Sequence, residues 1–349
     1  MAVYRIYPEK DTTIWSEPNS AGLYGNAGKD EILELGGYPD VNLVGRASRT
    51  LLKFNSDQIT DTLTNKVSGT YSSNLHLYLA EAKEIPQEYT VYAHPINSTW
   101  VNGVGKKDDN PINLTGVSWK YRGNQVDEWN TLGGDFNTLI TGSQSHGLTS
   151  NHDLNINVTE IIDAIASGSI ENHGILLKLE DTYENYTSAS INLKYFGADS
   201  NTIFPPYLEI KWDDSIYNST LSELTTDVVT VKIKNHKEKY SDSDIVRFNL
   251  SARPKYPVRS FTTSSIYLNE YKLPEETYYG IKDEFSGEMI VDFDSNYTKV
   301  SADNTSSYFS IYMNSFQPER FYRLLIKTTL NGSTVVIDNN NVFKVTRNG

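Results

Sequence analysis

Cysteine is absent from the 349 residues of the chain. Without cysteine the protein forms no disulfide, offers no thiolate to a metal ion and has no thiol nucleophile. Positive charge is scarce as well, because 31 Lys and Arg stand against 44 Asp and Glu, for a net charge of -13. Such an acidic chain repels the phosphates of nucleic acids, so we expect no nucleic-acid partner.

Long apolar runs are also missing, and we expect no membrane-spanning segment. The first residues, MAVYRIY, alternate between apolar and polar side chains. They lack the basic leader and apolar core of a signal peptide. We therefore expect a strand at the start of the chain and no secretion signal.

Residues that favour strands and turns dominate what is present. The chain holds 24 Tyr and 22 Gly, and apolar residues alternate with polar ones in many short stretches, for example 75–79 (LHLYL). One helix is predicted at 157–168, where Asn157 can cap a stripe of isoleucines and Gly168 follows as a stop. The sequence predicts an all-β protein with one short helix.

The length of the chain and a change in its composition indicate two domains. Residues 1–213 are predicted to form the first, and residues 214–224 have the composition of a linker. Residues 225–349 are predicted to form a smaller, immunoglobulin-like β-sandwich. Turns are expected between its last strands at 330–333 and at 338–341.

Within the first domain, a series of short motifs follows the order found in one known family. The series runs from 11–14 (DTTI) through 49–54 (RTLLKF) and 172–178 (NHGILLK) to 205–210 (PPYLEI). This order resembles the DNRLRE-type domain, a jelly roll related to carbohydrate-binding module family 96. The resemblance implies a jelly-roll β-sandwich in a protein that is secreted or displayed on a surface. The family has Asp after the RTLLKF-type strand, where this chain has Asn55.

The stretch 49–54 has two interpretations, a cationic ligand site or a scaffold strand. Its alternation directs Leu52 and Phe54 inward and Lys53 outward. Burying two such side chains stabilises the fold by roughly 1.5–3 kcal/mol each. We expect a scaffold strand in which Arg49 holds a strand end in place.

Two stretches of the second domain, 253–259 (RPKYPVR) and 316–323 (FQPERFYR), are similar to segments in structural proteins of tailed phages. The similarity implies a virion protein that is made in the host cytoplasm and released by lysis. Its partners would be other virion proteins, and a homo-oligomer is expected. Because Tyr and Arg anchor protein interfaces, the residues expected to dock are Tyr256, Arg259, Tyr278, Tyr279, Arg320 and Tyr322.

Catalytic motifs are not found in the sequence. His146, His152 and Asp153 are the one cluster of histidine and carboxylate. A polar loop explains it better than a metal site, which needs a third ligand and supporting partners. Adjacent acidic pairs such as 108–109 would point to opposite faces of a strand, unlike the paired carboxylates of glycosidases. We expect no enzymatic activity.

Exposed aromatic rings would favour sugar binding, because sugars stack on them. The candidates, several of them in a long Gly-, Asn- and Asp-rich loop at 100–154, are Trp15, Tyr24, Trp100, Trp119 and Trp129. The competing interpretation for each ring is ordinary burial, with Trp119 covering the core beneath the loop.

Calcium is a common structural ion in jelly rolls and takes oxygen ligands. Asp11, Asp30 and Glu31 are candidates, but no calcium-loop motif is present, and we expect no cofactor.

Together these features favour a non-enzymatic structural protein of a tailed-phage particle, in the neck, the tail or the capsid surface. The jelly roll would be displayed outward and the second domain would dock on neighbouring subunits. The alternative is a carbohydrate-binding module that mediates attachment to cell-surface glycan. A third interpretation is a secreted polysaccharide-binding protein that has lost its signal peptide.

Overall fold

The computed structural model describes residues 2–18, 21–39, 45–83, 85–86, 88–147, 149–185, 190–226, 228–257 and 269–348. The protein is all-β, as predicted, and divides into two compact units. The N-terminal unit comprises Ile6–Lys66 and Ser72–Glu209, and the C-terminal unit comprises Met1–Arg5, Val67–Tyr71 and Ile210–Gly349. Within the described residues, no helix has the length and apolar character needed to cross a membrane.

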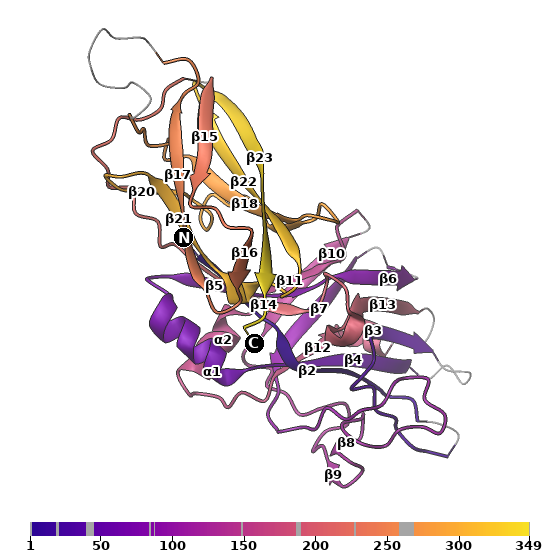
Figure 1. The fold of residues 1–349 in the computed structure, drawn as a ribbon. Coiled ribbons are helices and arrows are strands. Elements are labelled where there is room, and N and C mark those ends of the chain that lie inside the picture. Colours follow the sequence, from indigo (N-terminus) through magenta and orange to yellow (C-terminus); the bar gives the residue numbers. More distant parts are fainter. Residues whose placement is uncertain are drawn as a thin grey trace. The chain divides into compact units, whose positions relative to one another are not determined.

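The strands up to β14 form two sheets and a small hairpin (Figure 1), the arrangement of a jelly-roll β-sandwich. The larger sheet has the order β10 (Gly142–Gly147), β7 (Glu88–Pro95), β12 (Ile175–Leu179), β4 (Gly45–Phe54), β3 (Ile32–Pro39), β13 (Ile191–Phe196) and β6 (Leu79–Lys83), and β2 (Pro8–Trp15) also pairs with β4. The smaller sheet has the order β1 (Ala2–Ile6), β14 (Tyr207–Trp212), β5 (Tyr71–Leu77) and β11 (Leu154–Asn157). The hairpin consists of β8 (Tyr121–Gly123) and β9 (Asp127–Glu128).

The stretch 75–79, predicted as one strand, belongs to both sheets. Strand β5 ends at Leu77 and β6 begins at Leu79, so the chain changes sheets at Tyr78. The apolar alternation continues unbroken across this residue. The alternation therefore predicts strand conformation on both sides of Tyr78 but does not predict that the chain passes from one sheet to the other at this residue.

The predicted helix is confirmed as α2 (Thr159–Ala166). The Asn157 side chain accepts a hydrogen bond from the Thr159 N–H at 3.0 Å. Gly168 follows with a φ of 73°, a left-handed conformation that glycine adopts without strain. The N-cap position itself is Val158, whose side chain makes no capping hydrogen bond, so Asn157 acts from the residue before the cap, and Gly168 follows the helix as the predicted stop.

A second helical segment was not predicted. It consists of α1 (Ser56–Asp61) and a π-helical turn (Thr62–Lys66). The Asn55 side chain caps α1 by accepting a hydrogen bond from the Gln58 N–H at 3.0 Å. The residue that departs from the DNRLRE pattern thus begins a helix. Within the described residues, further short helical turns are α3 (Asp181–Glu184), Ala198–Ser200 and Met313–Ser315.

The region 100–154, predicted as a loop, is more regular than expected. It contains the β8–β9 hairpin and the strand β10, which pairs with β7 from Gly142↔Ala93 to Gly147↔Glu88. The sequence of β10, GSQSHG, has no apolar alternation. Its strand conformation comes from pairing with β7, which a local pattern does not record.

The C-terminal unit is an immunoglobulin-like β-sandwich of two sheets (Figure 1). One sheet has the order β15 (Val229–Lys234), β17 (Ile245–Pro254), β21 (Ser307–Tyr312) and β20 (Ser301–Ala302). The other has the order β16 (Lys239–Ser241), β23 (Ser333–Thr346), β22 (Phe321–Leu330), β18 (Thr277–Asp283) and β19 (Met289–Val291). Strands β16 and β23 pair in parallel.

Of the two turns predicted in this unit, one is confirmed. At 330–333, Asn331 and Gly332 have φ angles of 49° and 78°, as a tight hairpin turn requires. The turn predicted at 338–341 is wrong, because these residues lie inside β23. A positive φ of 55° at Asn340 accommodates the local irregularity without ending the strand.

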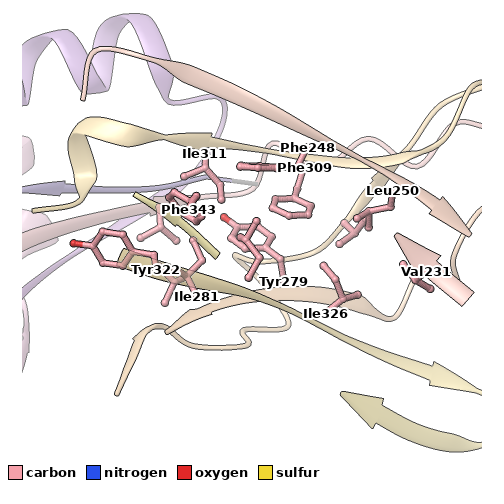
Figure 2. Packing of buried hydrophobic residues seen from close by; sticks show 14 of the residues in the cluster. Val231, Phe248, Leu250, Tyr279, Ile281, Phe309, Ile311, Tyr322, Ile326 and Phe343 are labelled. Atoms are coloured by element: carbon pink, nitrogen blue, oxygen red, sulfur yellow. The ribbon is translucent and has the colours of Figure 1, made fainter. Parts of the chain in front are cut away.

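Aromatic rings from both sheets fill the core of the C-terminal unit (Figure 2). The Tyr279 and Phe309 rings stack with centroids 4.5 Å apart and an interplanar angle of 10°. Phe248 stacks on Phe309 at 5.4 Å. Because Tyr279 lies on β18 and the other two on the opposite sheet, these contacts join the two layers.

The segment 214–224, predicted as a linker, packs on the C-terminal unit. Its Asn218 N–H donates to the Ala302 carbonyl at 3.0 Å, and Leu224 is buried in the core. The segment therefore adds to the sandwich that it leads into.

Replacing Phe309 by Ala is expected to destabilise the C-terminal unit by about 3–5 kcal/mol, because it leaves a cavity between the sheets. Amide hydrogen exchange of β17 and β22 in the intact chain measures the change. Phe285→Ala is the matched control, because Phe285 is 81% exposed in the same unit, and it should change stability by less than about 0.5 kcal/mol. Equal effects of both variants would contradict the core assignment.

Candidate functional site

Arg49 lies on β4 and binds protein groups, which confirms the expectation of a scaffold strand. Its Nε and Nη2 donate to the two carboxylate oxygens of Glu184 at 2.8 and 2.7 Å. Its Nη1 donates to the Gly133 carbonyl at 2.9 Å. Leu52 and Phe54 of the same strand are buried. The guanidinium therefore joins β4 to α3 and to the segment that follows β9.

Three of the five aromatic residues considered for sugar binding are buried. Trp100, Trp119 and Trp129 are only 3%, 8% and 4% exposed. Together with apolar residues of β2, β4 and β12 they form a cluster beneath the long segment. A sugar needs a ring with an open face, so the prediction for these three is wrong and the competing interpretation of burial is right.

The indole N–H groups of this cluster are also engaged. Trp100 donates to the His173 carbonyl at 2.8 Å, and Trp129 donates to the Ser118 carbonyl at 3.0 Å. The Arg49 guanidinium lies over the Trp119 ring, 4.9 Å from its centroid. These contacts hold the segment against the sheet as a structural cover.

The other two candidates differ from each other. Tyr24 is half-buried and packs against the tryptophan cluster. Trp15 is half-buried at the end of β2, where its Nε1 donates to Glu34 Oε2 at 3.0 Å. The Lys107 ammonium lies 5.2 Å from the centroid of its ring. Through these contacts Trp15 lies beside Glu34 and Lys107, two residues that line a small cavity.

That cavity has a volume of about 250 Å³ and is called the Gly36 cavity. Its lining consists of Glu34, Gly36, Tyr38, Ser48, Lys107 and Asn192. The strand register places Gly36 between Ser48 of β4 and Asn192 of β13. A Cβ at Gly36 would lie 2.7 Å from the Ile191 carbonyl oxygen, so only glycine fits there. The absent side chain leaves the hollow.

The walls of the Gly36 cavity are polar and fixed. Glu34 is buried, and its two carboxylate oxygens accept hydrogen bonds from Lys107 Nζ at 2.7 and 2.6 Å. The Tyr38 hydroxyl donates to Glu17 at 2.9 Å. Burial and the Glu17 carboxylate raise the pKa of Tyr38 well above its ordinary value, so the phenol stays neutral. The sequence offered no signal for this site beyond Trp15, because the register brings its residues together from four segments.

The predicted interface residues divide between surface and core. Tyr256 is 76% exposed, and Tyr278 and Arg320 are half-buried. Tyr279 and Tyr322 are buried in the core of the sandwich (Figure 2), so the prediction for these two is wrong. They occupy inward positions of β18 and β22, where Tyr is a core residue. Arg259 lies outside the described residues.

The sequence interpretation missed an exposed aromatic pair, Phe285 and Phe321. Their exposed fractions are 81% and 37%, and their ring centroids lie 5.7 Å apart at an angle of 87°. The turn that carries Phe285 is ordered, because Asp283 Oδ1 accepts hydrogen bonds from the Phe285 and Ser286 N–H groups at 3.1 and 2.8 Å. An apolar residue in a polar turn was the signal that could have indicated it. We call this region the Phe285 surface.

The cluster of His146, His152 and Asp153 is a packed part of the N-terminal unit. The two imidazoles stack on the Tyr89 ring with centroid distances of 4.9 and 5.7 Å, and the Tyr89 hydroxyl lies 2.7 Å from His152 Nδ1. Asp153 accepts a hydrogen bond from the Leu79 N–H at 2.7 Å. Burial lowers the pKa of His146. Among the described residues, no three His, Cys, Asp or Glu side chains are arranged to hold a metal ion.

The carboxylates considered for calcium bind protein groups. Asp11 is buried and accepts a hydrogen bond from the Ala198 N–H at 2.8 Å. Asp30 accepts one from the Lys107 N–H at 3.0 Å, and Glu31 pairs with Lys106. Burial raises the pKa of Asp11 to about 6, against the opposing effect of the Ala198 N–H.

No family model matches the chain, and no curated protein matches it. Among solved structures it is similar to a DUF4785-family protein of Legionella pneumophila, with 10% sequence identity and a TM-score of 0.15. The match covers 97% of this chain and 65% of that protein, so the chain spans just under two thirds of its length. A likeness at this level carries no argument, and the fold and the sites rest on the strand register and side-chain contacts described above.

Replacing Arg49 by Ala is expected to lower the free energy of unfolding by roughly 1.5–3 kcal/mol, because the buried Glu184 then loses the two hydrogen bonds from the guanidinium and keeps Lys178 as its cationic partner. Urea unfolding followed by tryptophan fluorescence is a suitable measurement, since four of the five tryptophans belong to the N-terminal unit. The control is Lys83→Ala, which removes an exposed pair with Glu81 and should leave the midpoint unchanged. A midpoint for Arg49→Ala equal to that of the control would contradict this role.

Asp11 gives a pH dependence of known sign. Its pKa is higher in the folded chain than its usual 3.8, so the folded state holds a proton that the unfolded state has already released. The stability that this proton contributes is present at low pH and is lost as the pH rises through about 6. Relative to Asp11→Asn, the wild type should therefore lose roughly 2–3 kcal/mol between about pH 4 and about pH 8. Unfolding curves that depend on pH in parallel for both proteins would rule out the raised pKa.

Proposed function

We propose that the chain is a non-enzymatic structural protein of a tailed-phage particle, in the neck, the tail or the capsid surface. It is made in the host cytoplasm and leaves the cell by lysis as part of the virion. The jelly roll is displayed outward, and the C-terminal unit docks on other virion proteins and on further copies of the chain.

The Phe285 surface carries this proposal. An exposed Phe forgoes roughly 1.5–3 kcal/mol of favourable burial, and a partner that covers it recovers this free energy. The hydrogen bonds that Asp283 Oδ1 accepts from the Phe285 and Ser286 N–H groups fix the turn, so Phe285 is already in place before a partner arrives. A pre-ordered aromatic side chain is the kind of residue on which interface energy concentrates.

Charged groups surround the two rings, as in the polar rim of an interface. Lys344 Nζ lies 5.7 Å from the centroid of the Phe321 ring and pairs with Glu319. Arg323 Nε donates to Glu284 at 2.6 Å beside the turn. An apolar centre within paired charges supports a protein partner.

Attachment to cell-surface glycan is the second candidate function. The Gly36 cavity favours it, because one aromatic residue, Tyr38, and several polar groups line one small hollow. The two functions are compatible, since the cavity belongs to the N-terminal unit and the Phe285 surface to the C-terminal unit.

The test is to purify intact particles of the phage, wash them in high salt and quantify the chain by peptide mass spectrometry. We expect a fixed copy number per particle. Particles assembled with Phe285→Ser should carry fewer copies, because the variant loses the apolar contact. Val336→Ser is the matched control, since Val336 is another exposed apolar residue of the same unit, and it should assemble normally.

Absence of the chain from washed particles would refute the virion proposal. A normal copy number for Phe285→Ser would keep the particle assignment and reject the Phe285 surface as the docking site.

A further inference from the structure

The lining of the Gly36 cavity includes a buried polar atom without a hydrogen-bond partner among the described residues. Asn192 Oδ1 makes no hydrogen bond with any described residue. The terminal amide torsion of Asn is broad, and this oxygen breaks no bond when the amide rotates. The side chain can therefore present either its oxygen or its NH₂ group to a molecule that enters the cavity.

The charges of the cavity cancel. Lys107 and Glu34 form an ion pair across its wall, at 2.6 Å between Nζ and Oε2. An anionic ligand would compete with Glu34, and a cationic ligand would compete with Lys107. A neutral ligand leaves the pair intact, and its hydroxyl groups can both donate to the carboxylate and accept from the ammonium.

Lys107 and Glu34 connect the cavity to Trp15. The Lys107 ammonium lies over the Trp15 ring, and the Trp15 indole N–H donates to Glu34 Oε2 at 3.0 Å. A ligand that binds to Glu34 and Lys107 therefore changes the surroundings of the Trp15 indole.

We propose that the Gly36 cavity binds one neutral, hydroxyl-rich ring, a single sugar residue of a larger glycan. Tyr38 is the aromatic residue of its lining, and Glu34, Lys107 and Asn192 hydrogen-bond the hydroxyl groups of the sugar. At about 250 Å³ the cavity lies below the usual range for drug-sized ligands, which suits one ring and not an oligosaccharide. The inference rests on the second candidate function and is independent of assembly into a particle.

The Trp15 indole N–H is the reporter. The intact chain, labelled with nitrogen-15, gives one indole signal for each of its five tryptophans, and Trp15→Phe identifies the signal of Trp15. The probes are glucose, galactose, mannose and N-acetylglucosamine, with glucuronate as the acidic comparison. At least one neutral sugar should shift the Trp15 signal in a saturable way and leave the four other indole signals in place.

Two variants test the role of the amide. Asn192→Ala should weaken binding of that sugar by about three- to tenfold, the loss expected for one neutral hydrogen bond. Lys120→Ala is the control, because Lys120 belongs to the same unit, lies outside the cavity lining and pairs with Glu128 at 3.0 Å. Its affinity should equal that of the wild type. The four other indole signals report whether each variant is folded.

A Trp15 signal that no neutral sugar shifts would overturn the proposal, as would tighter binding of glucuronate than of every neutral sugar. Equal affinities of Asn192→Ala and wild type would reject the assigned amide contact. If the intact chain binds a glycan array while the Trp15 signal stays unmoved, glycan binding survives and the Gly36 cavity is excluded as its site. Should Asn192→Ala fail to fold, Lys107→Ala serves in its place and should also weaken binding.

Discussion

The Arg49 side chain contacts three parts of the N-terminal unit at once, and the arrangement of these parts depends on it. Its donors reach Glu184 of α3 and the Gly133 carbonyl, and its plane covers the Trp119 ring. A guanidinium suits this position because it has five donors in one plane and two faces that stack on rings. A single residue of β4 thereby fixes both a helical turn and a long segment against the sheet.

That long segment covers an apolar sheet face without forming a helix. Its three tryptophans provide the apolar area, and the indole donors of Trp100 and Trp129 bond to backbone carbonyls. Three of the aromatic residues that the sequence suggested for sugar binding are therefore buried in the core and have no ring face open to a ligand. Among the features of the described residues that remain for recognition are a small polar hollow in one unit and an ordered aromatic turn in the other.

Local patterns in the sequence predicted most of the strands, the helix α2 and the hairpin turn at Asn331, because these follow from alternation and capping. Local patterns failed where the structure depends on pairing between segments that are far apart in the sequence. The polar strand β10 exists through its pairing with β7. The Gly36 cavity is assembled by the register of β3 with β4 and β13, and none of its residues is distinctive by itself. Tyr279 and Tyr322 were assigned wrongly for a different reason. Their residue type suggested an interface, whereas their positions on β18 and β22 place both side chains in the core.

The glycine at position 36 also bears on how this protein can change over time. The nearby Ile191 carbonyl excludes any larger residue there, so the demands of folding preserve the hollow whether or not a ligand uses it. Changes in the character of the hollow then fall on its side chains, such as Asn192 and Lys107, and a change at Lys107 also removes the ammonium that pairs with the buried Glu34. Because the backbone constraint at Gly36 keeps the hollow in place, substitutions in the side chains around it can change which ligand it accepts.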